Sequence, residues 1–344
     1  MSIIKSFASD NYAGAPPAIM QALAKANEAH AVSYGDDPIT AAAIGKFKEI
    51  FGQDIDVFFV YNGTGANVLG LSALTVSYNS IICANCAHIN VDESTAPEIF
   101  TGCRMVTIDS SNGKITPQQL SEKIIRIGDQ HHPQAGVVSI SQSTEFGTVY
   151  SIDEIKALSA VIRSHGLSLH MDGARIANAA VSLGKNFAAF TKDAGVDALS
   201  FGGTKNGLLF GEAVVLFKQG LSQHVRYLRK QAMQLNSKMR FISAQFDALL
   251  TDELWKKNAA HSNSMAKLLE KELQKIPQVK ITQSVDANGV FATMPPHVIP
   301  DLQKKYPFYV WNETTHESRL MCSWDTKEEE VLGFVEELRR LIGG

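Results

Sequence analysis

The stretch LSFGGTKNGLLFGEAVVLF, residues 199–217, places Lys205 in a glycine-rich loop between two short apolar runs. Continuous apolar runs of this length are typical of buried strands, and we expect strands over residues 198–201 and 213–217. Taken alone, this stretch fits a solvated loop lysine and a lysine that holds a bound group equally well. The neighbouring glycines allow the backbone to pack closely around such a group.

Similar apolar runs recur along the chain and alternate with helical patterns. We expect further strands over residues 57–61, 80–83, 105–108, 136–140 and 167–171. The helical patterns include residues 17–30, 39–51, 66–76, 116–128 and 152–165. Continuous apolar strands joined through helices predict an α/β fold with a mainly parallel sheet covered on both faces. In such sheets the ligand-binding groups follow the carboxyl ends of the strands.

The pattern changes after about residue 220. Long helical segments are followed by short strand-like runs at residues 279–281, 290–293, 308–311 and 319–323, and then by a closing helix. At roughly 150 residues per domain, a chain of 344 residues predicts two domains. We expect a large domain over residues 1–245, including the N-terminal segment, and a smaller α+β domain over residues 246–344.

Composition favours small-molecule chemistry. The 32 Lys and Arg residues nearly balance the 35 Asp and Glu residues, so the formal net charge is −3. This balance argues against nucleic acid or a membrane surface as a partner. The chain has 45% hydrophobic and 19% charged residues, no signal-like N-terminal run and no long apolar window, which is typical of a globular protein. We expect a cytoplasmic location, with the four cysteines reduced.

Asp172 and Arg175 follow another predicted strand, in LSLHMDGARIANAA, residues 167–180. Asp172 fits the N-cap of the next helix, and it also fits a ligand-binding position at the end of a strand. If the strands before Asp172 and Lys205 are neighbours in the sheet, the two side chains converge on one mouth. A lysine that binds an aldehyde, beside a carboxylate that keeps a ring nitrogen protonated, is the arrangement that pyridoxal phosphate requires.

A second glycine-rich turn offers a place for the phosphate. In FFVYNGTGANVLGLSAL, residues 58–74, a strand leads through Gly63 and Thr64 into a helix. The N–H groups and dipole at a helix N-terminus favour an anion, and Thr64 adds a hydroxyl donor. A plain turn fits the same residues. The spacing matches neither the dinucleotide fingerprint nor the P-loop, which argues against a nucleotide.

His88 and Glu93 lie together in ICANCAHINVDES, residues 82–94, shortly after a predicted strand. The imidazole of His88 is able to stack on a cofactor or to exchange a proton, and Glu93 is close enough to share the pocket. Taken alone, a surface histidine at a helix start is the more common case. Cys83 and Cys86 lack a second pair of ligands, so we predict no metal site.

The motifs in combination resemble the low-specificity L-threonine aldolases, which are pyridoxal-phosphate enzymes of the aspartate-aminotransferase (type I) fold. The matching pieces, in the family's order, are FASDNYAG (7–14), YGDDP (34–38), FFVYNGTGAN (58–67), AHINVDE (87–93), LHMDGARIANA (169–179), SFGGTKNG (200–207), SKMRF (237–241) and RLMCSWDT (319–326). The resemblance implies a large domain with a mainly parallel seven-stranded sheet and a small C-terminal α+β domain. It also implies a homotetramer, built as a dimer of dimers.

The resemblance further implies how the cofactor is held. Lys205 carries it covalently, Asp172 pairs with the pyridine nitrogen, and His88 stacks on the ring. The phosphate contacts come from Gly63, Thr64, Thr204 and, in a partner subunit, Arg240.

The same resemblance implies the substrate contacts. Arg175 contacts the ring hydroxyl and the substrate carboxylate, and Ser9 and Arg319 complete the carboxylate clamp. Tyr34 is a pocket residue that a neighbouring subunit contributes, and His131 lies near the substrate β-hydroxyl, although adjacent His132 leaves that alignment ambiguous.

Two segments depart from the family pattern. Many relatives read SKGLG around the lysine and ENTHN before the aspartate strand, whereas this chain reads GGTKNGL and QSTEFG. Gln142 and Glu145 therefore replace residues of the second motif, while Thr144 still matches. These departures are typical of a sub-branch, and they leave the roles of Gln142 and Glu145 open.

The expected reaction is retro-aldol cleavage of L-threonine, L-allo-threonine and other β-hydroxy-α-amino acids to glycine and an aldehyde. The base that takes the β-hydroxyl proton is His88, His131 or a water held by Glu93, and the sequence does not choose among them. Another type I enzyme, such as a β-eliminating lyase, a dehydratase or an aminotransferase, is the nearest alternative. A catalytically silent binding protein and a nicotinamide dehydrogenase fit the motifs less well.

Overall fold

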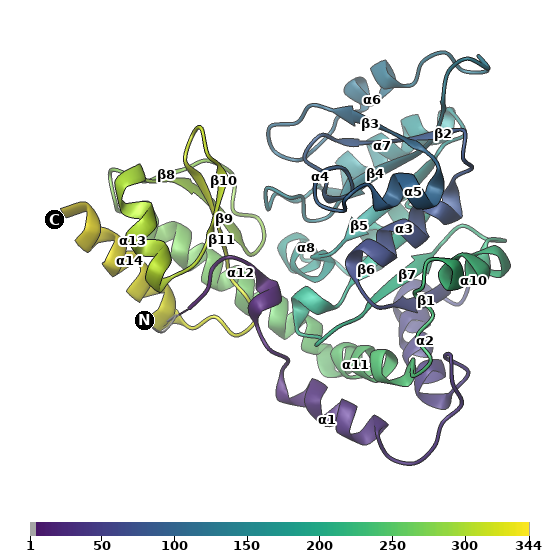
Figure 1. Cartoon of the computed structure of the whole chain (residues 1–344), viewed down its shortest axis with the longest axis horizontal. Coiled ribbons are helices and arrows are strands. Elements are labelled where there is room, and N and C mark those ends of the chain that lie inside the picture. The colour runs from purple at the N-terminus through teal and green to yellow at the C-terminus, as the bar shows by residue number, and fades with distance from the viewer. Residues whose placement is uncertain (1–4, 344) are drawn as a thin grey trace.

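The computed structural model describes residues 5–343, which form two α/β bodies joined by a long helix (Figure 1). The larger body contains a seven-stranded sheet, and the smaller body contains a four-stranded sheet. Among these residues, no helix combines the length and apolar character needed to span a membrane.

The large sheet is mainly parallel, as predicted. Its strands are β1 (Asp56–Val60), β2 (Asn79–Ala84), β3 (Arg104–Ile108), β4 (Gln134–Ser141), β5 (Ser168–Gly173), β6 (Ala198–Gly202) and β7 (Glu212–Leu216). They lie in the order β1-β7-β6-β5-β4-β2-β3, and only β7 runs antiparallel to its neighbours. Every predicted strand of this sheet is present, because continuous apolar runs are buried on both faces.

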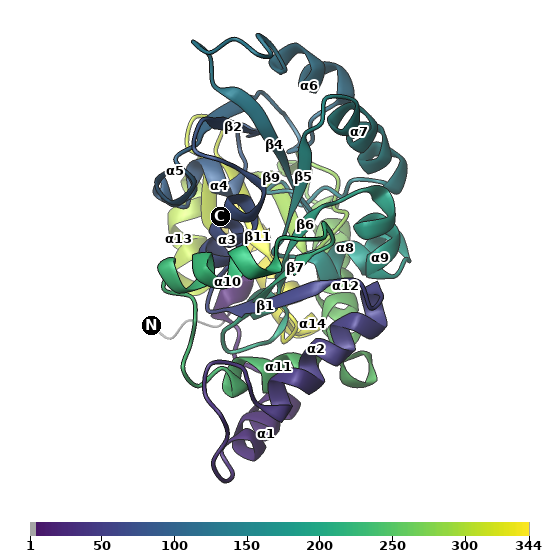
Figure 2. The ribbon, with the colours of Figure 1, turned by 90° about the vertical axis from the view of Figure 1, so that its right-hand side faces the viewer.

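Helices cover both faces of the sheet (Figure 2). They are α1 (Pro17–Ala26), α2 (Pro38–Phe51), α3 (Gly63–Leu74), α4 (His88–Val91), α5 (Ala96–Thr101), α6 (Pro117–Lys123), α7 (Ile152–Ser164), α8 (Ile176–Leu183), α9 (Phe187–Phe190), α10 (Ser222–Gln231) and α11 (Arg240–Leu250). One apolar cluster joins α3 and α10 to β1, β6 and β7, and the main core packs α2, α7, α9 and α11 on the other side. The central strands β5, β6 and β7 are therefore fully buried, and their ends are the places left for a site.

Two helices are shorter than the periodicity predicts. The helix expected over 17–30 ends at Ala26, and the one expected over 116–128 ends at Lys123. After Lys123 the chain turns through Arg126 and Gly128, both with positive φ, before β4 begins. The α6 helix stops at Ile124, whose φ of −86° and ψ of 85° are not helical, and the apolar period does not encode this change of backbone.

The small domain is antiparallel. Its strands are β8 (Lys280–Ile281), β9 (Gly289–Thr293), β10 (Tyr309–Asn312) and β11 (Glu317–Met321), in the order β10-β11-β9-β8. The helices α12 (Leu254–Leu273), α13 (Ile299–Lys305) and α14 (Glu328–Gly343) enclose a separate apolar cluster with the sheet. This domain has its own core, as the change of pattern after residue 220 predicts.

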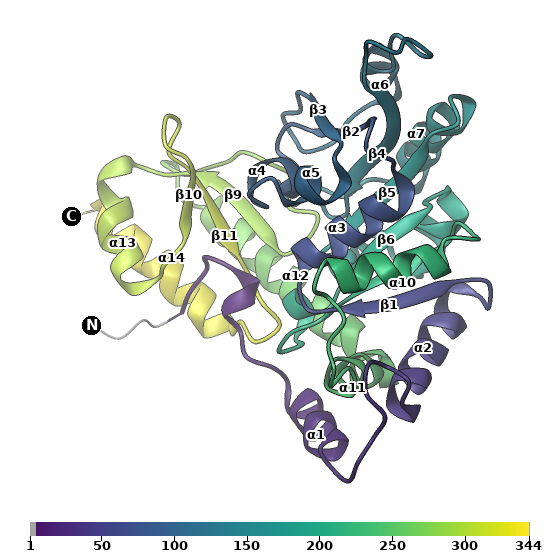
Figure 3. The same cartoon turned by 45° about the vertical axis from the view of Figure 1, so that its right-hand side comes forward.

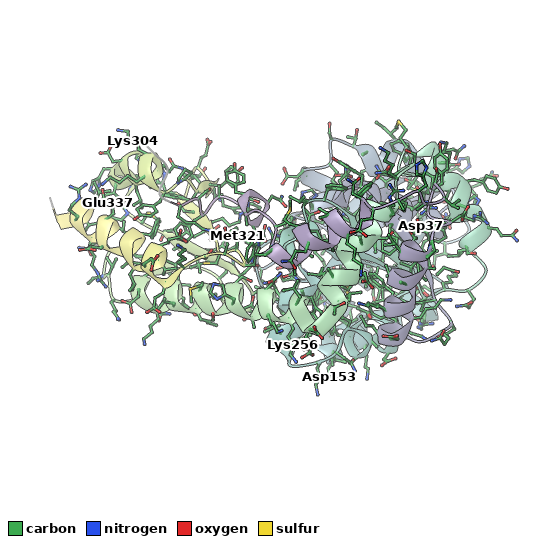
Figure 4. All side chains as sticks on the ribbon, turned by 90° about the horizontal axis from the view of Figure 1, so that it is seen from below. Asp37, Asp153, Lys256, Lys304, Met321 and Glu337 are labelled. Carbon is green, nitrogen blue, oxygen red and sulfur yellow. The ribbon has the colours of Figure 1, made fainter. Side chains whose placement is uncertain are left out.

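The packing of the two domains differs in two places from the predicted domain boundary at residue 245. The whole of α11 packs in the large core, so α12 is the element that crosses between the domains. Lys256, near its start, lies under the large domain, whereas Glu337 on α14 lies on the small one (Figure 4). The N-terminal segment, expected with the large domain, instead buries Phe7 in the small core, with its ring 5.2 Å from that of Phe334.

The N-terminal segment therefore runs along the small domain before it reaches α1 (Figure 3). Phe7 donates its N–H to the Pro307 carbonyl, and its own carbonyl accepts from Met321, which is labelled at the junction of the domains in Figure 4. Two backbone hydrogen bonds and a buried aromatic ring fix this segment. The residues that follow it are thereby held between the domains.

Candidate active site

A cavity lies at the carboxyl ends of the large-sheet strands, and residues of both domains line it. One part has a volume of about 230 Å³ and reaches the small domain at Tyr309, Trp311 and Arg319. A second part of about 450 Å³ extends along the N-terminus of α3. Both parts share Gly63, His88, Asp172 and Lys205. The cavity thus lies at the carboxyl ends of the strands, which is the edge of the sheet where the sequence predicts a site.

Lys205 and Asp172 reach this cavity from adjacent strands. β5 and β6 pair in parallel, with Asp172 opposite Ser200, which confirms the predicted adjacency. Lys205 lies in a short 3-10 turn (Thr204–Asn206) directly after β6. Burial, reinforced by the charge of Arg175, lowers the pKa of the Lys205 ammonium below its ordinary value. A buried lysine of this kind is a stronger nucleophile near neutral pH.

Asp172 is held by two donors. Its Oδ1 accepts the N–H of Ala174 at 2.9 Å, and its Oδ2 accepts the side-chain amide of Asn67 at 2.9 Å. Asp172 does not cap α8, whose N-cap residue is Arg175 with no side-chain cap bond. Of the two interpretations that the sequence allows for Asp172, the ligand-facing one fits this geometry.

His88 and Glu93 form a pair in the cavity wall. The Nδ1 atom of His88 lies 2.9 Å from Oε1 of Glu93, whose side chain is fully buried. This hydrogen bond raises the pKa of the His88 imidazole above its ordinary value. Because Glu93 holds Nδ1–H, the Nε2 atom of the neutral ring is left as the proton acceptor.

Glu145, which departs from the family pattern, lies behind His88. Its Oε1 accepts the backbone N–H of His88 at 2.9 Å and the hydroxyl of Ser141 at 2.6 Å. Burial raises the pKa of the Glu145 carboxyl. Gln142 instead points into the core, where it donates to and accepts from the backbone of Tyr150. Glu145 is thus part of the site, and Gln142 supports the loop.

Arg175 is clamped by a residue that the sequence analysis did not single out. Its Nε and Nη2 atoms lie 2.7 and 2.9 Å from the two carboxylate oxygens of Asp10. Asn288 donates to the same carboxylate at 3.0 Å. Burial opposes ionisation of Asp10, but the charge and hydrogen bonds of Arg175 outweigh it and hold the pKa of Asp10 below its ordinary range.

Arg319 brings a second guanidinium into the cavity. It stacks 4.7 Å from the centre of the Trp311 ring and 5.4 Å from that of Tyr309, and its Nη2 donates to the Ala8 carbonyl at 3.2 Å. Burial, with the nearby charge of Arg175, lowers the pKa of Arg319 to about 10. Two buried cations in one cavity favour a carboxylate ligand.

The start of α3 presents free donors to the other end of the cavity. Asn62 caps the helix by accepting the N–H of Gly65 at 2.8 Å. Among the described residues, no hydrogen bond uses the N–H of Gly63 or Thr64. Gly63 and Thr64 both line the second part of the cavity, and a Cβ on Gly63 would meet nothing within 4 Å. This is the geometry of an anion site at a helix N-terminus.

Comparisons with a family model, with related sequences and with solved structures agree on one family. A family model described as beta-eliminating lyase matches residues 6–295. The low specificity L-threonine aldolase of Pseudomonas sp. (strain NCIMB 10558) is 45% identical over 98% of both chains. A solved threonine aldolase structure from Leishmania major has a TM-score of 0.93 and 31% identity, covering 98% of this chain and 99% of that chain. The chain belongs to the low-specificity L-threonine aldolases.

The fold is shared more widely than the family. Aspartate aminotransferase from Thermus thermophilus, at 15% identity, has a TM-score of 0.72 over 98% of this chain and 90% of its own. The threonine aldolase family and this type I fold imply pyridoxal phosphate. The residues present fit it, since a partly buried lysine, a carboxylate on the adjacent strand and a helix N-terminus open to an anion share one cavity.

Most residues that the resemblance to the aldolases singles out meet in this cavity. Its lining contains Ser9, Gly63, Thr64, His88, Glu93, Asp172, Arg175, Thr204, Lys205 and Arg319. Sequence analysis missed Asp10 and did not single out Asn67. Both lay inside quoted motifs, FASDNYAG and FFVYNGTGAN, and their place in those motifs was the signal available.

Three residues to which the resemblance gives a role in the site lie outside the cavity of their own chain. Tyr34 is about half exposed, with Lys230 over its ring, and Arg240 borders a separate small hollow with residues 29–33. His131 lies in an exposed turn before β4, at the amino end of that strand and so at the opposite edge of the sheet. Within one chain, therefore, His131 does not meet the β-hydroxyl position that the resemblance implies for it.

Proposed function

We propose that this chain cleaves L-threonine, L-allo-threonine and other β-hydroxy-α-amino acids to glycine and an aldehyde, with pyridoxal phosphate as its cofactor. The observation that carries the proposal is a single cavity that Lys205, just after β6, and buried Asp172, on the adjacent strand β5, share with the guanidinium groups of Arg175 and Arg319. The name and 45% identity of the Pseudomonas relative support the same reaction.

The chain's residues supply three kinds of contact to the cofactor. Lys205 would attach it, and Asp172, which accepts two hydrogen bonds from the protein, would pair with the pyridine nitrogen. The N–H groups of Gly63 and Thr64, with Thr204, bind the phosphate. When bound, pyridoxal phosphate supplies an electron sink for negative charge at the substrate Cα.

Arg175, Arg319 and Ser9 bind the substrate carboxylate, and this contact decides which bond is broken. A carboxylate fixed by two guanidinium groups leaves the rest of the amino acid one orientation relative to the ring. The side chain of the substrate then points toward His88. This placement of the substrate by the chain's own residues would favour retro-aldol cleavage over the competing reactions.

We assign the base to His88. Its Nδ1 is held by Glu93, so Nε2 takes the proton of the substrate β-hydroxyl. The raised pKa of the imidazole favours this transfer near neutral pH. Glu93 orients the ring and stabilises the imidazolium that forms, as a buried carboxylate does beside a catalytic histidine.

We also propose a cytoplasmic homotetramer, a dimer of dimers, in which neighbouring subunits contribute to each site. Tyr34 and Arg240 support this arrangement, because both are family positions that lie away from their own cavity. Size-exclusion chromatography with light scattering tests the assembly directly, and a monomer with full activity would contradict it.

The first experiment identifies the products formed from L-threonine by the purified, cofactor-supplemented protein. We expect glycine and acetaldehyde by mass spectrometry, and neither product from Lys205→Ala. Borohydride reduction followed by intact-mass measurement tests the attachment site, because the wild type gains the mass of the cofactor and Lys205→Ala does not. Release of 2-oxobutyrate and ammonia would instead identify a dehydratase on the same fold.

A further inference from the structure

One side-chain amide in the cavity donates to two carboxylates at once. The Nδ2 atom of Asn67 lies 2.8 Å from Oε1 of Glu93 and 2.9 Å from Oδ2 of Asp172. Asn67 is only 2% exposed, and its Oδ1 atom has no partner among the described residues. Both amide hydrogens are therefore used, and the two carboxylates fix which end of the amide carries the nitrogen.

These hydrogen bonds are part of a longer chain of contacts. Oε1 of Glu93 also lies 2.9 Å from Nδ1 of His88, so Asp172, Asn67, Glu93 and His88 form one connected series. The four residues come from β5, α3, the segment after α4 and the start of α4. The two ends of the series are the residues that, under the proposed function, meet the cofactor's ring nitrogen and its ring face.

The series solves an electrostatic problem. Two buried carboxylates that share one neighbour repel each other, and without compensation one of them takes up a proton. A neutral amide that donates to both favours the ionised form of each without adding a charge. Asp172 must be ionised to hold a proton on the ring nitrogen, and Glu93 must be ionised to hold the His88 Nδ1–H. Asparagine is suited to both tasks.

We propose that Asn67 is a positioning residue that keeps Asp172 and Glu93 ionised side by side, and so sets both the ring-nitrogen proton and the tautomer of His88. The inference rests on the proposed function, because it gives the two ends of the series their roles. It adds a residue that acts through Asp172 and Glu93 and that need not touch the substrate itself.

Other titratable groups face the same series. They are Lys205 after β6, Arg175 before α8, Glu145 after β4, and His170 on β5, whose pKa burial lowers to about 4. His170 is buried between the hydroxyls of Ser139 and Ser200, at 2.9 and 3.0 Å. All of these groups are unchanged in a variant of Asn67, so a difference from wild type reports the change at residue 67.

Asn67→Asp is the sharpest test, because it keeps the shape and replaces the donor by a third carboxyl. The matched control is Asn178→Asp. Asn178 is also buried and helical, and its amide donates to two neutral oxygens, Ser262 Oγ at 2.9 Å and Asn263 Oδ1 at 2.8 Å. Both variants bury a new carboxyl, and only Asn67→Asp places it between two others.

Two readouts separate positioning from general damage. The visible absorption spectrum of the cofactor-loaded protein is titrated between about pH 5 and 9, and cofactor affinity is measured by fluorescence on the cofactor-free protein. We expect Asn67→Asp to shift the spectral midpoint by about one pH unit or more and to weaken the cofactor about tenfold above pH 7. The cofactor affinity should recover toward pH 5, where the new carboxyl is protonated and donates again.

A wild-type spectral midpoint and wild-type affinity in Asn67→Asp would overturn the inference, as would equal changes in Asn178→Asp. If Asn67→Asp does not fold, Asn67→Ala removes both donors without adding a charge, and the same midpoint shift decides. The spectrum does not depend on which substrate bond is broken, so release of 2-oxobutyrate by the wild type would refute the proposed reaction alone. A wild type that takes up no cofactor would overturn both.

Discussion

The buried ion pair between Asp10 and Arg175 offers the most direct test of how the carboxylate clamp is held. Asp10→Asn keeps the shape of the side chain and removes its charge. The Arg175 side chain is 13% exposed and that of Asp10 is fully buried, so water does not replace the lost partner. The substitution therefore leaves a guanidinium in the cavity without its bidentate acceptor.

The size of the effect follows from this burial. Removing one partner of a buried pair costs about 3–5 kcal/mol of unfolding free energy. Asp172 and Glu145 also attract Arg175, and the new amide oxygen still accepts one hydrogen bond, so we expect the lower end, about 3 kcal/mol. We expect kcat/KM for L-threonine to fall about a hundredfold, because a guanidinium free to turn no longer orients the substrate.

Urea unfolding of the cofactor-free protein measures the first quantity, and steady-state kinetics measures the second. Asp129→Asn is the matched control, since its Arg126 partner is 2.6 Å away but the two side chains are 33% and 51% exposed. An exposed pair contributes less than about 1 kcal/mol. Because the pKa of Asp10 is held below 3.8, the gap between wild type and Asp10→Asn should persist above that pH and close in stronger acid. Equal unfolding free energies for the two variants, or kcat/KM within about twofold of wild type for Asp10→Asn, would refute the reasoning.

Two further substitutions test the loop around Lys205. Burial raises the pKa of Glu212 from 4.5 to about 7, so its ionisation destabilises the wild type as pH rises through that interval. Glu212→Gln should therefore be the more stable protein at pH 8, by up to about 3 kcal/mol without cofactor, and unchanged pH dependence would contradict this. A Cβ on Gly202 would lie 2.3 Å from the Ala174 carbonyl, whereas one on Gly45, inside α2, meets nothing within 4 Å. Thermal unfolding should show a large loss for Gly202→Ala and a gain of about 0.5–1 kcal/mol for Gly45→Ala, and a wild-type Tm for Gly202→Ala would rule out the close approach.

The strands of the large sheet were predictable because strands covered on both faces have continuous apolar sequences. The run at residues 198–201 became β6, Ala198–Gly202, and the run at 167–171 became β5, Ser168–Gly173. Strand order was not predictable in the same way. β7 lies between β1 and β6 and runs antiparallel to both, and no feature of its own residues marks that position.

The site residues divide in the same way into those marked by a local sequence pattern and those that depend on a partner far away in the sequence. Lys205, Asp172 and Gly63 each follow a strand in a local pattern of glycines and polar residues, which a sequence displays directly. Asp10 acts through Arg175, which lies 165 positions away, and Asn67 acts through Asp172, 105 positions away. A lone polar residue gives no sign of such a partner. His131 is the opposite case. The family motif gives it a role in the site, but the fold places it outside the cavity of its own chain.

The way in which the N-terminal segment binds both arginines bears on how the enzyme selects a bond. Asp10 holds Arg175 of the large domain, and the carbonyl of Ala8, two residues away, accepts from Arg319 of the small domain. Phe7 anchors this segment in the small core. The spacing of the two guanidinium groups is therefore fixed by a few consecutive residues that bridge the domains, and it does not depend on substrate to bring the domains together. Under the proposed function, a carboxylate that enters meets two guanidinium groups already in place, so the orientation of the substrate is set by the fold before the reaction begins.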